Sequence, residues 1–196
     1  MKLPDKLPRI KYNSPVIITF ALISLGALLL SWATGGKSNA LLFSVYRSPM
    51  RDVLTYPRFF FHVMGHADLS HYMNNFMIIL LVGPMLEEKY GSRLMIAMIA
   101  ITAFVTGLVF FIFFPHSALL GASGVVFMMI LLSSFANAGK SEIPLTLILV
   151  TVLYLGTEIY DGLFSPDNVS QLAHLIGGAC GGIFGWLVAN GTVGKR

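Results

Sequence analysis

Long stretches without a formal charge constrain this chain more than any other feature of its sequence. Residues 15–34 contain no Asp, Glu, Lys or Arg, and neither do residues 69–86 or 94–139. A helix of about 20 such residues crosses the roughly 30 Å of hydrocarbon in a bilayer. The chain is 56% hydrophobic and only 11% charged, whereas a soluble domain is about a quarter charged. These features predict an integral membrane protein and exclude a secreted disulfide scaffold, a disordered tail and an ordinary cytosolic enzyme.

The few charges also limit the partners. The net charge is only +4, and the 13 basic residues are scattered without an aromatic-interleaved basic patch, so we expect no nucleic-acid partner. Cys180 is the single cysteine, which excludes an internal disulfide and leaves the redox compartment open. We expect the lipid bilayer as the surroundings, while the sequence leaves the oligomeric state open.

Charges and helix breakers divide the chain into six expected membrane helices. The run 94–139 is too long for one helix, and Pro115-His116-Ser117 supplies the break. Only helices or closed barrels satisfy the backbone in lipid, and no run alternates as a barrel strand does. We therefore predict an all-α polytopic membrane protein, one domain over residues 1–196. The expected spans are about 15–34, 70–87, 94–114, 119–137, 143–160 and 170–190, the fifth continuing past Glu158.

Basic residues set the expected orientation. With the N-terminus in the cytoplasm, nine of the 13 basic residues are cytoplasmic and four, Lys37, Arg47, Arg51 and Arg58, lie in one outer loop. This distribution favours N-in and C-in. Residues 1–14 then form a short basic cytoplasmic tail, and the first span is expected to remain a helix rather than act as a cleaved signal peptide.

The first loop, residues 35–69, is too long and too apolar for a plain connector. Its segment 59–64, Phe-Phe-Phe-His-Val-Met, is expected to lie in the membrane interface, with Arg58 at headgroup level. Glu87, at the far end of the second span, is expected to mark a helix terminus in the headgroups.

His62 and His66, in the same loop, have the i, i+4 spacing of a pair of metal ligands. No HExxH pattern accompanies them, and we expect the nearby Asp68 to be solvated. We therefore interpret the two histidines as hydrogen-bonded loop residues and expect no metal.

Three polar clusters lie inside the expected spans, where polar groups are costly and mark functional sites. They are His71-x3-Asn75 in the second span, Gly121-Ala122-Ser123-Gly124 in the fourth and Ala173-His174 in the sixth. Each cluster lies near the N-terminal end of its span, and these three spans run in the same direction. We therefore expect the clusters at one membrane face, the outer face when the N-terminus is inside.

The spacing in the sixth span predicts how two of these clusters meet. His174, Gly177 and Gly181 share one helical face, and Gly177-x3-Gly181 is a pattern that lets another backbone approach closely. If the neighbour is the fourth span, His174 meets Ser123, and Phe127, one turn after Ser123, can pack against the imidazole.

A serine and a histidine so placed support acyl transfer. Serine needs a base to take its proton, and His174 is the candidate, which gives a Ser–His dyad. Asn75 Nδ2, His71 and the backbone N–H of Ser123 are candidate donors to the oxyanion. Each residue has an alternative role: Ser123 as a small packing residue, His174 as a polar interhelical contact, His71 and Asn75 as helix caps. The combination favours the catalytic interpretation.

These residues resemble the rhomboid family of intramembrane serine proteases, and specifically its compact six-span bacterial GlpG type. The similar residues are Arg58, His71-x3-Asn75, Glu87 followed by Gly91, Gly121-Ala122-Ser123-Gly124, and Ala173-His174-x2-Gly177-x3-Gly181. The resemblance implies a rhomboid-like bundle with Ser123 as nucleophile, His174 as base, and His71 with Asn75 as transition-state donors. We expect structural support from Arg58, Glu87, Phe127, Gly121, Gly124, Gly177 and Gly181.

The resemblance also implies a substrate class and a location. The substrates would be transmembrane segments of other membrane proteins, cleaved near the outer face of a bacterial inner membrane without a metal or cofactor. Two residues depart from many relatives: Pro57 stands where they have Trp, and Phe127 where they have Tyr. Neither change removes a reacting group. The alternatives are a non-catalytic rhomboid-like chaperone and a small transporter, although the paired interrupted spans of a transporter are not evident.

Overall fold

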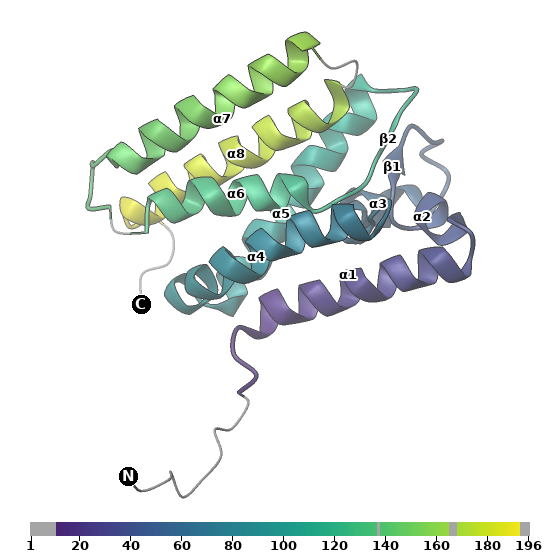
Figure 1. Cartoon of the computed structure of the whole chain (residues 1–196), viewed down its shortest axis with the longest axis horizontal. Coiled ribbons are helices and arrows are strands. Elements are labelled where there is room, and N and C mark those ends of the chain that lie inside the picture. Colours follow the sequence, from purple (N-terminus) through teal and green to yellow (C-terminus); the bar gives the residue numbers. More distant parts are fainter. Residues whose placement is uncertain (1–10, 137, 165–167, 193–196) are drawn as a thin grey trace, which may run out of the picture.

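Apolar helices account for most of the chain in the computed structural model, which describes residues 11–136, 138–164 and 168–192 (Figure 1). The long helices are α1 (Pro15–Ala33), α4 (Leu69–Tyr90), α5 (Ser92–Phe113), α7 (Leu145–Phe164) and α8 (Asn168–Ala189), and α6 (Ser123–Ser134) is shorter. The first loop contains α2 (Lys37–Leu41), β1 (Val45–Tyr46), α3 (Thr55–Phe61) and the 3₁₀ turn η1 (His62–Met64), and β2 (Ala118–Leu119) precedes α6.

Four of the described helices are long and apolar enough to cross a bilayer: Pro15–Ala33, Leu69–Tyr90, Ser92–Phe113 and Gln171–Ala189. The prediction of a mainly helical membrane protein is therefore confirmed, while six spans with both ends inside remain a prediction. The helix α7 does continue past position 158, as expected. Residues 1–10 of the expected basic tail, and the terminal Lys195 and Arg196, lie outside the described residues.

The arrangement of the helices brings three helix starts together. The helices α4, α6 and α8 run in the same direction, and each begins at the end of the bundle that carries the first loop (Figure 1). The helix α1 lies at one edge beside α4, and α7 at the other edge beside α8. Apolar side chains between these helices form the core, including Phe76, Ile79, Met128 and Leu132.

The fourth expected span, 119–137, is corrected by the structure. Its helix begins at Ser123 and ends at Ser134, and Asn137 lies outside the described residues. Residues 118–119 instead form β2, which pairs antiparallel with β1 of the first loop. Gly121, at φ +125°, then turns the chain into the helix, a conformation that favours glycine. The apolar run conceals this turn, because the pairing partner lies more than 70 residues earlier in the sequence.

The helices α6 and α8 make the most extensive interhelical contact of the described chain. Gly177 lies so close to α6 that a Cβ there would be 2.8 Å from Gly124 Cα and closer still to the Gly124 carbonyl. A Cβ on Gly181 would be 2.9 Å from Met128 Cα. This contact confirms the predicted packing of the sixth span against the fourth. It holds the start of α6 against the first half of α8.

Glu87 lies in the last turn of α4 and is buried within the protein, while its expected depth at the headgroups stays a prediction. Its carboxylate accepts hydrogen bonds from the backbone N–H groups of Val16 (3.1 Å) and Ile17 (3.0 Å) and from Ser92 Oγ (2.7 Å). The first N–H groups of a helix lack intrahelical acceptors, and the helix dipole favours a negative charge there. Glu87 therefore caps α1 from the end of α4 and ties α1, α4 and α5 together.

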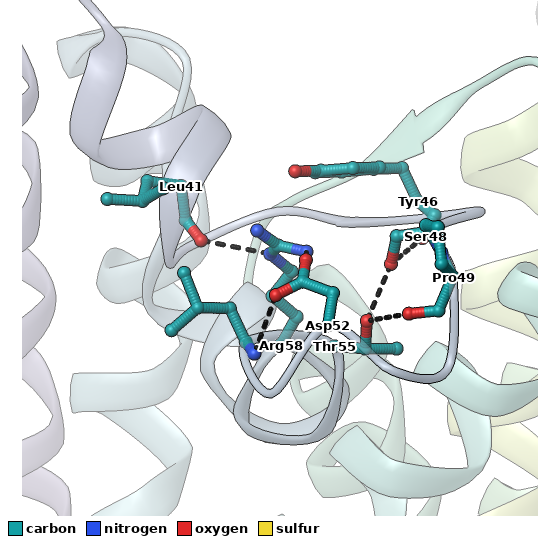
Figure 2. Close-up of polar contacts among 8 residues, drawn as sticks. Leu41, Tyr46, Ser48, Pro49, Asp52, Thr55 and Arg58 are labelled. Atoms are coloured by element: carbon teal, nitrogen blue, oxygen red, sulfur yellow. Dashed lines mark hydrogen bonds and ion pairs between the residues drawn. The ribbon is translucent and has the colours of Figure 1, made fainter.

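Arg58 is also buried within the protein, while its expected depth at the headgroups stays a prediction. Figure 2 shows its polar contacts. Its Nε donates to the carbonyl oxygen of Leu41 (2.9 Å), and its Nη1 pairs with Asp52 Oδ2 (2.9 Å). The guanidinium carbon lies 4.6 Å from the centre of the Tyr46 ring. The first loop folds back over α3, so these groups replace water around the charge. Arg58 thereby joins three segments of the first loop.

Candidate active site

A cavity of about 460 Å³ opens where α4, α6 and α8 begin. It is lined by side chains from the three polar clusters of the sequence: His71 and Asn75 from α4, Ser123 from α6 and His174 from α8. The loop 118–120 forms another wall. The structure thus brings together four residues that lie up to 103 positions apart in the sequence.

Ser123 is the first residue of α6 and is half-buried. The backbone reaches it through Gly121, whose N–H donates to the carbonyl oxygen of His62 (2.9 Å). This bond, together with the β1–β2 pairing, anchors the loop in front of the helix. The N–H of Ser123 belongs to the first turn, where N–H groups have no intrahelical acceptor and attract negative charge.

His174 lies on the face of α8 that packs against α6. The centre of its imidazole is 4.5 Å from that of the Phe127 ring, at an interplanar angle of 39°. The prediction that Phe127 packs on this histidine is confirmed. Gly177, one turn further along α8, allows the close approach of the two helices that brings His174 to the cavity.

His71 and Asn75 lie one turn apart on α4, facing the loop that leads to Ser123. A Cβ on Gly121 would be 2.7 Å from His71 Cε1 and Nε2 and 3.9 Å from Asn75 Nδ2. Gly121 therefore has a second reason to be glycine, because any side chain would displace the imidazole. Asn75 is buried, and its Nδ2 has no hydrogen-bond partner among the described residues. A buried amide that keeps its donor unpaired is costly, and such groups often have a functional role.

The cap of α4 is a different residue from those considered in the sequence. Asp68 accepts a hydrogen bond from the backbone N–H of His71 (2.8 Å), which satisfies one N–H group of the first turn. Asp68 is exposed, as expected, and in addition caps the helix. The side chains of His71 and Asn75 therefore do not cap α4, and both line the cavity.

His62 and His66 are hydrogen-bonded loop residues, as predicted. His62 Nε2 lies 3.0 Å from the carbonyl oxygen of Ala103, and His66 Nδ1 lies 3.2 Å from that of Met64. Burial lowers the pKa of each histidine to about 4, so both are neutral at pH 7. In the described part of the chain, no three His, Cys, Asp or Glu side chains come together in a way that could hold a metal ion.

The sequence analysis missed one neighbour of the site. The ring of His66 meets that of His71 edge-on, with centroids 5.0 Å apart, so it lies behind the imidazole that lines the cavity. Asn39 Nδ2 donates to the carbonyl oxygen of His66 (2.9 Å) and holds this support in place. The sequence signal for this contact was that His66 lies in the apolar first loop, five residues before His71.

A hydroxyl, an imidazole and several N–H donors in one cavity are the groups that acyl transfer requires. The half-buried Ser123 and His174 supply the first two groups. Asn75 Nδ2 is one of several buried polar atoms without a hydrogen-bond partner among the described residues, and it is the one that belongs to the cavity lining. The cavity can thus accommodate a carbonyl group between a nucleophile and hydrogen-bond donors.

Comparison with known proteins agrees with this architecture. The family model of the Rhomboid domain matches residues 54–191, which include Arg58 and the cavity residues His71, Asn75, Ser123 and His174. Rhomboid-related protein 1 of Caenorhabditis elegans is 34% identical over 154 residues, which cover 71% of this chain and 42% of that protein. The chain thus spans less than half the length of this relative. Because the family model covers well over half of the chain, this protein belongs to the rhomboid family.

Proposed function

We propose that this protein is an intramembrane serine endopeptidase that hydrolyses peptide bonds in or near transmembrane segments of other membrane proteins. The observation that carries the proposal is the cavity at the starts of α4, α6 and α8, where Ser123 and His174 lie with the unpaired Asn75 amide. A substrate carbonyl oxygen in the cavity would supply the acceptor that this amide lacks among the described residues.

In the proposed reaction, His174 takes the proton of Ser123 Oγ while this oxygen attacks the carbonyl carbon of the scissile bond. The developing oxyanion accepts hydrogen bonds from Asn75 Nδ2, His71 and the N–H of Ser123. The protonated His174 then gives its proton to the leaving amine, which leaves an acyl-enzyme. A water molecule, deprotonated by His174, attacks this ester and releases the acid and the free serine.

The neighbouring residues in this proposal position the reacting groups. Phe127 limits the tilt of the His174 ring, and His66 supports the His71 ring from behind. Gly121 leaves room for His71, and Gly124 lies against Thr106 and Ala173 where α5, α6 and α8 meet. Glu87 and Arg58 stabilise the helix ends and the loop around the cavity.

The proposed topology has six spans with both ends in the cytoplasm. The helices α6 and α7 would be the two further spans. The helix α6 is short for a span, and the segment 118–122 that precedes it would complete the crossing of the membrane. The distribution of basic residues supports this orientation. The cavity then faces the outer side, which in a bacterial inner membrane is the periplasm. Its outward position would give water access to a reaction that takes place within a membrane domain.

The deciding experiment combines labelling and cleavage. Purified protein in detergent is treated with a fluorophosphonate probe and, separately, with a model transmembrane substrate. We expect Ser123→Ala to abolish both labelling and cleavage with no change in thermal unfolding. Ser133→Ala, in the same helix but bonded to the Ile130 carbonyl, is the matched control and should retain both.

Each alternative makes a different prediction in the same assay. A non-catalytic rhomboid-like binding protein, or a small transporter, would show neither labelling nor cleavage in the unmodified chain. Retained cleavage in purified Ser123→Ala would contradict the assignment of the nucleophile.

A further inference from the structure

A second cavity lies away from the candidate active site, between α1, α5 and the turn η1. It is an apolar groove of about 430 Å³. Its walls include Val16 and Phe20 of α1 and Ile96 and Ala100 of α5. Thr19 is its one hydroxyl-bearing lining residue. In a membrane helix bundle, such a groove opens toward lipid rather than water.

The length of the groove corresponds to one leaflet of a bilayer. On α1 it extends from Pro15 to Ile23, and on α5 from Ile96 to Ala103. At about 1.5 Å per residue these segments are about 10–12 Å long, close to the roughly 15 Å of hydrocarbon in one leaflet. A single acyl chain that enters from one membrane surface would therefore lie along it.

The end of the groove that lies near the middle of the bundle is formed by the first loop. Phe60, Val63 and Met64 line the groove there. The hydrogen-bonding contact between His62 Nε2 and the Ala103 carbonyl oxygen (3.0 Å) fixes η1 at this end of α5. The groove is thus bounded near the middle of the bundle, and its other end lies at the starts of α1 and α5.

The end of the groove at the starts of α1 and α5 carries a positive charge. Arg93 precedes Ile96 and Ala100 by three and seven residues, so the three share one face of α5. Arg93 is exposed and forms no ion pair within the part of the chain that the structure describes. Tyr12 lies beside the groove as well, because its hydroxyl is 2.8 Å from Thr19 Oγ1. A cation and a tyrosine at the end of an apolar helix pair are typical of the headgroup region.

We propose that the groove binds one acyl chain of an anionic phospholipid, with the lipid phosphate against Arg93. An acyl chain that leaves the bilayer for the groove gains no hydrophobic free energy, because both surroundings are apolar. The preference for a lipid must therefore come from the headgroup, and Arg93 selects a negative one. The bound chain contacts Val63 and Met64 and so connects the lipid to the loop that carries His62 and His66.

The test measures lipid binding rather than activity, so it is independent of the proposed protease function. Native mass spectrometry of the purified protein in detergent gives dissociation constants for phosphatidylglycerol and for phosphatidylcholine with identical chains. We expect tighter binding of phosphatidylglycerol. Arg93→Ala should weaken its binding about fivefold, since one basic residue near the surface contributes about 1 kcal/mol. Arg93→Lys should retain most of the preference.

Two matched controls make the result specific. Lys140→Ala removes an exposed cation at the same end of the bundle, but in the segment between α6 and α7, and should leave binding unchanged. Ala100→Leu fills the groove and should weaken binding of both lipids, whereas Ala97→Leu, on the exposed face of α5, should not.

Equal binding of the two lipids by the unmodified protein would overturn the proposal. Equal losses in Arg93→Ala and Lys140→Ala would overturn it too, because they indicate unspecific surface attraction. If Ala100→Leu fails to fold, the comparison of Arg93→Ala with Lys140→Ala still tests the proposal, because both residues are exposed.

Discussion

Replacement of Gly177 by alanine tests the contact that positions the candidate catalytic pair. The added Cβ would lie 2.8 Å from Gly124 Cα, whereas non-bonded carbon atoms prefer about 3.5–4.0 Å. The obstructing atoms are backbone, which no side-chain rotation can move. The helices α6 and α8 must therefore separate by roughly 1 Å at this point. Ser123 and His174 are carried on these two helices, one on each.

The net effect on stability is the difference between two terms. Alanine in place of glycine in a helix gains about 1 kcal/mol from backbone propensity. Overpacking a close contact costs typically 1–3 kcal/mol, and a contact with rigid backbone belongs at the upper end. We expect Gly177→Ala to lower the free energy of unfolding by about 1–2 kcal/mol, the remainder after the propensity gain. A misplacement of about 1 Å should also reduce cleavage about 10²-fold.

Gly182 provides the matched control on the same helix. A Cβ there meets nothing within 4 Å, so only the propensity term remains. Gly182→Ala should therefore raise the free energy of unfolding by about 1 kcal/mol and leave cleavage unchanged. Thermal unfolding in detergent, followed by circular dichroism, gives the order of the three proteins. Equal shifts in Gly177→Ala and Gly182→Ala, or an unchanged Gly177→Ala, would refute the reasoning from close packing.

Two further predictions concern the polar residues around the cavity. Asn75→Ala should lower kcat more than it changes KM. The decrease in kcat should be smaller than the roughly 10²–10³-fold that one oxyanion donor contributes elsewhere, because His71 and the Ser123 N–H remain. Single-turnover cleavage and thermal unfolding on the same samples measure this, and a loss of stability without a rate defect would remove Asn75 from the site. The pKa values of His62 and His66 are lowered by burial to about 4, so between about pH 6.5 and pH 4 the unfolded chain binds protons that the folded protein does not. Stability should therefore fall as the pH decreases through this window, with a slope of up to about 1.4 kcal/mol per pH unit for each histidine; unfolding at several pH values checks this, and a slope that is the same in His62→Gln would contradict it.

Local patterns in the sequence were sufficient for the long helices and for the meeting of the polar clusters. A long run without charges is sufficient to predict a membrane helix, because only a helix or a closed barrel satisfies the backbone hydrogen bonds in lipid and no run alternates as a barrel strand does. The direction of successive helices then places His71, Ser123 and His174 at one end of the bundle. The spacing of Gly177 and Gly181 likewise identified the helix face that packs against α6, because helical periodicity is a property of the segment itself.

The partners of the charged residues were decided only by the tertiary structure. Glu87 caps a helix that begins more than 70 residues earlier, and Arg58 bonds to the Leu41 carbonyl across a folded loop. The pairing of β1 with β2 shortens α6 and brings Gly121 under His71. A charged side chain next to an apolar helix has the same local pattern whether it meets headgroups or a distant backbone. The choice depends on which segment the fold brings beside it, and sequence periodicity carries no information about that.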